Sequence, residues 1–219
     1  MTKSVFLLGI VLLSSISSAQ DATPKTMLKL EVRLQSPDAP TGSFASLPKV
    51  MYRSGTRHCR VEEAADPQNN IHGLLITNEP DAWVVNLATS AAQHFVDQGP
   101  TFNCRLPIFS DEDAVSAKDS SLRILALEFG GELAYFKSKG AIPKPGPVLQ
   151  TKQTISYEVQ VGPTTLKLFT YGPQEFPLAV SRQRGDKLET FWYSGYGPLP
   201  FDPKLFAKPE RIKIAEQKP

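Results

Sequence analysis

The sequence predicts a mainly β fold with some α-helix: a strongly curved antiparallel sheet, or half-closed barrel, that encloses one or two helices. Apolar and polar residues alternate along most of the chain, as they do in strands with one buried face. Residues 121–139 instead space their apolar side chains three or four apart, as a helix does. One helix covers a large sheet only if the sheet curls around it, and such a hollow is a natural apolar pocket.

The N-terminal residues 1–19 have the layout of a secretory signal peptide. Lys3 precedes an apolar run over residues 5–13, and small side chains end the segment at Ala19. The run is shorter than the roughly 20 residues that span a membrane as a helix. A buried core helix is the alternative, but the serines of residues 14–18 would interrupt it. We therefore predict an exported protein, periplasmic or extracellular, whose single mature domain covers residues 20–219.

Charge and hydropathy argue against a nucleic-acid partner and against an integral membrane protein. The chain has 24 basic and 22 acidic residues, and loss of Lys3 with the signal leaves a net charge of +1. This balance does not favour nucleic acid. No second apolar run reaches membrane length, so the sequence predicts a protein that is not integral to a membrane.

Strands are expected wherever the alternation is clear, and most of them form hairpins. Residues 27–35 place four apolar side chains on one face and charged or amide groups on the other. Short turns rich in glycine, asparagine or proline join the later strands. The expected hairpins cover residues 50–53 with 58–63, 74–77 with 83–87, 155–161 with 166–171, and 178–183 with 187–193.

Helix is expected in the middle of the chain. Residues 121–139 form one or two amphipathic helices, bent at Gly130-Gly131 and stopped at Gly140. Three prolines make residues 142–148 irregular, and residues 202–206 fit a single helical turn.

The two cysteines favour a disulfide. Cys59 is in phase with Val61, and Cys104 with Leu106 and Ile108, so both point to an apolar side. In an oxidising compartment such a pair is commonly bridged, and a loop of this length adds about 4 kcal/mol of stability. Two buried free thiols remain the alternative.

Catalytic and metal chemistry are not indicated. His58, His72 and His94 share no metal-ligand spacing with one another, and the acidic runs have the composition of solvated loops. Neither cysteine stands at a helix start or sharp turn that would activate a thiolate. The sequence therefore predicts a protein that is not an enzyme, with no catalytic residues, no metal and no cofactor.

Several short patterns resemble a known fold group. They are Arg60-Val61-Glu62 after a glycine turn, residues 78–87, Pro177-Leu178 opening a strand, and the closing residues 202–214. The chain resembles the periplasmic lipoprotein-carrier-like (LolA/LolB-like) fold superfamily, as an uncharacterised secreted member. The resemblance implies a half-barrel with helices in its mouth that binds acyl chains. It assigns no lid-holding role to Arg53, Arg57 or Arg60.

The function expected from these patterns is binding of a lipid or an acylated ligand in the hollow, in envelope lipid or lipoprotein handling. The partner is then a lipid or acyl chain, a lipoprotein or an envelope protein. The alternative is a protein–protein interaction module of the cell envelope whose hollow is filled by its own helix. The residues expected to line the pocket are Leu30, Val32, Trp83, Val85, Tyr157, Val159 and Leu168 from strands, and Leu125, Phe129, Leu133 and Phe136 from the helical stretch.

Overall fold

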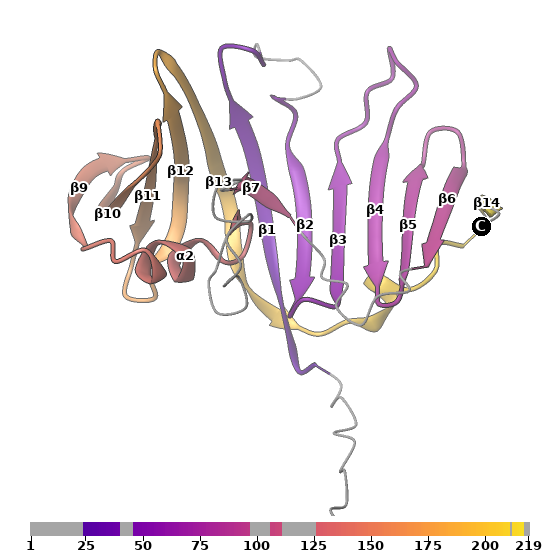
Figure 1. The fold of residues 1–219 in the computed structure, drawn as a ribbon. Coiled ribbons are helices and arrows are strands. Elements are labelled where there is room, and N and C mark those ends of the chain that lie inside the picture. The colour runs from indigo at the N-terminus through magenta and orange to yellow at the C-terminus, as the bar shows by residue number, and fades with distance from the viewer. Residues whose placement is uncertain (1–23, 40–45, 97–105, 111–125, 211, 217–219) are drawn as a thin grey trace, which may run out of the picture.

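Twelve strands form one large sheet in the computed structural model (Figure 1). The structure describes residues 24–39, 46–96, 106–110, 126–210 and 212–216. The strand order is β14-β6-β5-β4-β3-β2-β1-β13-β12-β11-β10-β9, and the sheet is curved but does not close into a barrel. The prediction of a mainly antiparallel sheet is confirmed. The described residues form an open sheet with one short α-helix, so the half-closed barrel that encloses helices is not confirmed.

The elements follow one another along the chain as two sets of hairpins. The first set is β1 (Thr26–Gln35), β2 (Lys49–Ser54), β3 (His58–Glu63), β4 (Gly73–Asn78), β5 (Asp81–Asn86) and β6 (Ala91–Val96). The second set is β9 (Lys144–Leu149), β10 (Lys152–Val161), β11 (Thr164–Tyr171), β12 (Phe176–Arg184) and β13 (Lys187–Pro200), followed by η3 (Pro203–Phe206) and β14 (Lys213–Glu216). Between the sets lie β7 (Pro107–Ser110), β8 (Ala126–Glu128) and the helix α2 (Glu132–Ser138).

The two sets join through β1 and β13, which pair antiparallel from Thr26 opposite Pro200 to Gln35 opposite Thr190. All four predicted hairpins are present, as β2 with β3, β4 with β5, β10 with β11 and β12 with β13. The strand β14 differs from the rest because it pairs parallel to β6. The separate pair β7 and β8 lies outside the large sheet.

The predicted helix over residues 121–139 is wrong over part of its length. Residues Ala126–Glu128 are the strand β8, and α2 covers only Glu132–Ser138. The reason is Gly130, whose φ of +84° takes the chain out of any helix just before α2 begins. Residues 121–125 lie outside the described part of the chain.

The prediction that residues 142–148 are irregular is also wrong, since Lys144–Leu149 forms β9. This strand is at the edge of the sheet, where only one side pairs with a neighbour. An edge strand tolerates prolines because the missing N–H groups can face away from the ladder. The predicted turn at 202–206 is confirmed as η3.

The sheet buries apolar side chains on both faces. Antiparallel partners share a face, so Leu30, Met51 and Val61 lie together on the face that also packs against α2. We call it the helix face. On the opposite face, the register aligns Ile76 with Trp83 beside Arg60.

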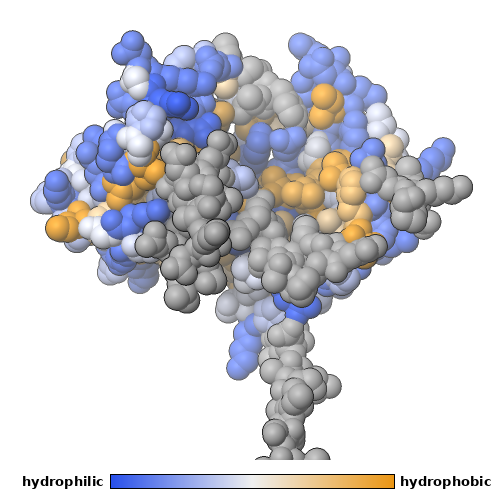
Figure 2. All heavy atoms as spheres, in the orientation of Figure 1, coloured by the Kyte–Doolittle hydropathy of each residue, from blue (hydrophilic) through white to orange (hydrophobic). Residues whose placement is uncertain are grey.

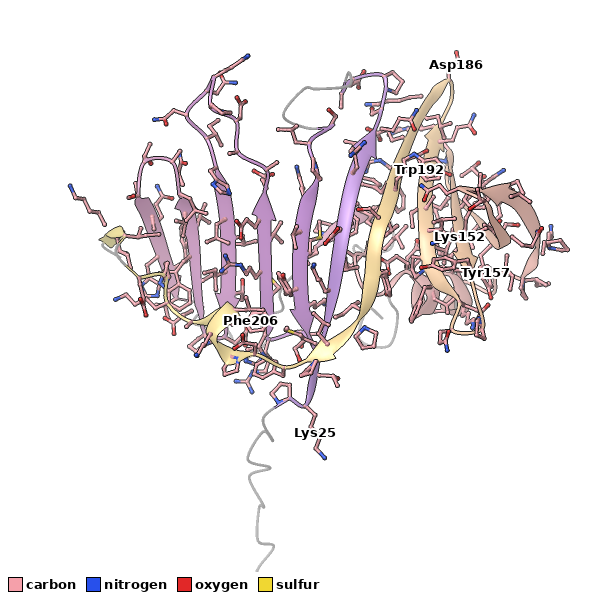
Figure 3. The ribbon with its side chains drawn as sticks, turned by 180° about the vertical axis from the view of Figure 1, so that it is seen from behind. Lys25, Lys152, Tyr157, Asp186, Trp192 and Phe206 are labelled. Carbon is pink, nitrogen blue, oxygen red and sulfur yellow. The ribbon has the colours of Figure 1, made fainter. Side chains whose placement is uncertain are left out.

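A second core lies on that opposite face, which we call the tail face. It contains Leu74, Ile76, Trp83, Val85 and Ala92, and the C-terminal residues Ile212 and Ile214 pack against it. The turn η3 buries Phe206 completely at the same end of the sheet, where it contacts β3 and β4 (Figure 3). The C-terminal segment therefore covers one end of the tail face.

Candidate functional site

The helix α2 and the β8 segment fill the hollow over one half of the sheet. The helix contacts β10, β11 and β12 (Figure 1). Its Tyr135 and Phe136 are fully buried. Most of the predicted pocket residues meet in this cluster, which contains Leu30, Val32, Tyr157, Val159, Leu168, Phe129 and Phe136, with Leu133 packed against it. They form a packed core around the helix, while Leu125 lies outside the described residues.

Trp83 and Val85 do not join the other predicted pocket residues. The register places both on the tail face, in the second core, with Ile76 and Leu74 as their neighbours on β4. The expectation that they face the helix was wrong. The physical reason is that β5 is apolar on both sides, because Ala82 and Val84 alternate with Trp83 and Val85.

A buried carboxyl fixes the start of α2. Glu132 is 1% exposed, and its Oε1 accepts hydrogen bonds from the Tyr193 hydroxyl at 2.6 Å and from the Gly130 N–H at 2.8 Å. The Tyr196 hydroxyl lies 3.3 Å from its other oxygen. Burial raises the pKa of Glu132, and burial together with Glu132 raises the pKa of Tyr193 well above its ordinary value. The helix is thereby attached to β13 through polar contacts inside an apolar core.

A second polar group fixes the other end of the helix. Lys137 Nζ lies 2.8 Å from Glu175 Oε2, and the Tyr157 hydroxyl donates to the other carboxylate oxygen. The hydrogen bond from Lys137 is the largest cause of the lowered pKa of Glu175. Burial, followed by the bond to Glu175, raises the pKa of Tyr157 to about 12. The turn before β12 is thus connected to α2 across the hollow.

Arg53 holds the segment that leads into α2. Its guanidinium donates to the Phe129 carbonyl at 2.8 Å and to Glu128 Oε2 at 3.0 Å. We predicted no role for Arg53 from the sequence. A signal existed, since Arg53 is in phase with the buried Met51, and a charge on a buried side of a strand requires a partner.

The helix face is apolar beyond the part that α2 fills. Val61, Leu75 and Val84 are aligned across β3, β4 and β5, and Phe95 on β6 lies in the adjacent row. We call these four residues the apolar strip. Val84 is 49% exposed, and Figure 2 shows apolar side chains gathered on this side of the molecule. The pair of Lys49 and Glu63, 3.1 Å apart, borders the strip on the same face.

The three histidines contact aromatic rings or carboxylates and do not form a metal site with other described residues. His58 lies edge-on to Phe201 and Phe206, and burial lowers its pKa. His94 stacks on Trp83 with its Nε2 2.7 Å from Asp81, while His72 lies 3.3 Å from Glu62. Within the described ranges no three His, Cys, Asp or Glu side chains gather as metal ligands would.

Cys59 is fully buried and disulfide-bonded. The other cysteine of the chain, Cys104, lies outside the described residues, so the pairing of Cys59 with Cys104 stays a prediction.

Comparisons with solved structures give distant likenesses of fold. An uncharacterized conserved protein from Thermus thermophilus has a TM-score of 0.49 and 10% identity, over 88% of this chain and 91% of that one. The Pseudomonas aeruginosa MucA/MucB complex gives a TM-score of 0.41 and 9% identity, over 84% of this chain and 56% of that one. A LolA superfamily protein from Nitrosomonas europaea gives 0.33 and 11%, over 84% and 90%.

A member of the superfamily that the sequence resembles is therefore among the structural neighbours. No protein-family model and no curated protein matches the sequence. With identities near 10% and TM-scores below 0.5, the likenesses carry no conclusion about function. In the part of the chain that the structure describes, no helix has the length and hydropathy needed to cross a bilayer.

Proposed function

We propose that this chain is an exported, non-enzymatic protein that binds the acyl chain of a lipid or of an acylated molecule on the helix face of its sheet. The observation that carries the proposal is the apolar strip, where Val84 is 49% exposed in line with Leu75 and Val61. An exposed valine alone is ordinary on a protein surface. A continuous apolar row inside a curved sheet is typical of a ligand site.

The chemistry of the strip suits an alkyl chain. Its side chains offer no hydrogen-bonding group, so affinity comes from burial, at about 0.8 kcal/mol for each methylene removed from water. Lys49 and Glu63 at its border give a polar end where a headgroup would meet water.

A specific observation also favours the alternative function, an envelope interaction module. The hollow over β10–β13 is filled by the protein's own helix, with Tyr135 and Phe136 fully buried. In this second candidate function the apolar strip would receive a side chain of a partner protein. The two candidates differ in ligand, and both use the same surface.

Substitution of Val84 tests the site. Val84→Glu places a charge in the strip, and we expect it to weaken binding of a fluorescent fatty acid at least tenfold. Val96→Glu is the matched control, because Val96 is 54% exposed on the neighbouring strand β6 and points to the tail face. Absence of fatty-acid binding by the wild-type protein, or equal binding by the two variants, would contradict the acyl-binding proposal.

Native mass spectrometry of protein purified from the cell envelope tests the ligand and the export together. We expect a co-purified lipid and a polypeptide mass that begins at Gln20 or within a few residues of it. A chain that retains Met1 would contradict export. Protein free of lipid that carries a second polypeptide would support the interaction module instead.

A further inference from the structure

A wide groove among the described residues lies away from the apolar strip. It has a volume of about 1170 Å³ and is lined from β1, from β13 and from the segment before β2. A smaller groove of about 250 Å³ crosses β11, β12 and β13. Both are lined by Leu188, Thr190 and Trp192, so they form one continuous depression along β13.

This depression, which we call the outer groove, lies on the tail face. Trp192 is paired with Arg33 on β1 and with Ala179 on β12, and Ala179 is paired with Phe169 on β11. Antiparallel partners share a face, and Tyr193, the next residue after Trp192, belongs to the core on the helix face. The outer groove is therefore separated from the acyl site by the thickness of the sheet.

An aromatic ring is held in place at the centre of the outer groove. The indole N–H of Trp192 donates to Gln35 Oε1 at 2.8 Å, which fixes the orientation of the ring (Figure 3). Ala179 separates Trp192 from Phe169, so the two rings stand two strands apart, roughly 10 Å, on either side of a small residue. Two aromatic faces at this spacing suit the apolar C–H faces of sugar rings in an oligosaccharide chain.

The rest of the lining is neutral and rich in hydrogen-bonding groups. Ser36, Ser46, Thr190 and Ser194 contribute hydroxyls to the larger groove, and Gln35 and Gln150 contribute amides. Such groups match sugar hydroxyls, which both donate and accept hydrogen bonds.

The charged side chains that line the outer groove are basic, which favours an anionic ligand. Of the described residues lining the larger groove, Arg33 alone is charged, and it is exposed beside Trp192. The smaller groove contains Lys167, which Glu158 neutralises at 3.0 Å. None of the described lining residues is acidic. Arg33 therefore offers a two-pronged donor to a carboxylate on the ligand.

We propose that the outer groove binds an acidic oligosaccharide, with sugar rings on Trp192 and Phe169 and a sugar carboxylate on Arg33. This function goes beyond acyl binding and uses the opposite face of the sheet. One exported protein would then hold an apolar chain on one face and a glycan on the other.

Isothermal titration calorimetry with two tetrasaccharides tests the proposal. Tetragalacturonic acid is the acidic probe and cellotetraose is the neutral one, both at low ionic strength so that the charge contact is not screened. We expect Arg33→Gln to weaken binding of the acidic tetramer at least tenfold and to leave the neutral tetramer unchanged. We expect Trp192→Ala to weaken both at least tenfold.

Arg184→Gln is the matched control, because Arg184 is exposed on β12 and lines neither groove. It should bind both tetramers as the wild type does. Equal effects of Arg33→Gln and Arg184→Gln, or retained binding in Trp192→Ala, would overturn the proposal. So would wild-type protein that binds neither tetramer, the result expected if the outer groove instead receives a protein segment. The acyl-site variant Val84→Glu should bind both tetramers normally, so failure of one proposal is distinguishable from failure of the other.

Discussion

The hydroxyl of Tyr193 on β13 donates a 2.6 Å hydrogen bond to Oε1 of Glu132, the first residue of α2, and both side chains are buried. The contact connects the helix in the hollow to the strand that joins the two halves of the sheet. A buried carboxylate is costly unless a cation pairs with it. The groups that contact Glu132 are hydroxyls and an N–H, so burial dominates and raises its pKa.

The raised pKa of Glu132 predicts a loss of stability with rising pH. The unfolded chain releases this proton near the ordinary pKa of 4.5, while the folded protein still holds it. Stability therefore falls as the pH rises from about 4.5 to the raised pKa, by about 1.4 kcal/mol for each unit of elevation. Glutamine does not titrate. Between pH 5 and pH 8 the wild type should therefore lose stability with rising pH and Glu132→Gln should not, so the difference in unfolding free energy should change in favour of the variant. Urea unfolding at each pH measures the difference, and parallel curves for the two proteins would contradict the prediction.

Glu175, at the other end of α2, should show the opposite sign. Its pKa is lowered by the hydrogen bond from Lys137, so the unfolded chain takes up a proton before the folded protein does as the pH falls. The stability that Glu175 contributes is present above about pH 4.5 and is lost as the pH falls through the lowered pKa. Glu175→Gln should cost about 0.5–1 kcal/mol at pH 6, a modest value because the ion pair is partly exposed, and less at pH 3.

Glu158→Gln is the control for that series, because Glu158 pairs with Lys167 at 3.0 Å on the sheet surface, away from α2. Its cost at pH 6 should stay below that of Glu175→Gln. A cost that is the same at pH 6 and pH 3 for Glu175→Gln would show that the carboxylate charge is not what holds the helix.

The hairpins were predictable from the sequence because each strand has one clearly apolar side, as in β1 with Leu30 and Val32. Alternation says which residues of a strand share a face, but it cannot choose a face when both sides are apolar. β5 is such a strand, and its Trp83 and Val85 were assigned to the wrong side for that reason. The extent of α2 was overestimated because the apolar spacing of residues 126–129 suits a helix as well as a buried strand.

Substitution of each cysteine tests the predicted bridge. If Cys59 and Cys104 are paired, Cys104→Ser should lower the free energy of unfolding by about 4 kcal/mol through loss of the cross-link. Cys59→Ser should cost at least as much, because Cys59 is also fully buried. The double variant should be little worse than Cys59→Ser alone. Unchanged stability of Cys104→Ser, or free thiols in unfolded, unreduced protein, would contradict the pairing.

A side chain at Gly130 should destabilise the junction between β8 and α2. Its φ of +84° is in the left-handed region, and a Cβ there would lie 3.1 Å from Leu28 Cδ2. Gly130→Ala should therefore destabilise the protein by about 1–2 kcal/mol. The next glycine is the control: Gly131 has a φ of −126°, and a Cβ would lie 3.7 Å from its nearest neighbour, the Glu128 carbonyl oxygen. Gly131→Ala should stay within about 0.5 kcal/mol of the wild type. Thermal and urea unfolding of both variants measure the difference, and equal costs would show that the backbone at Gly130 does not determine where α2 begins.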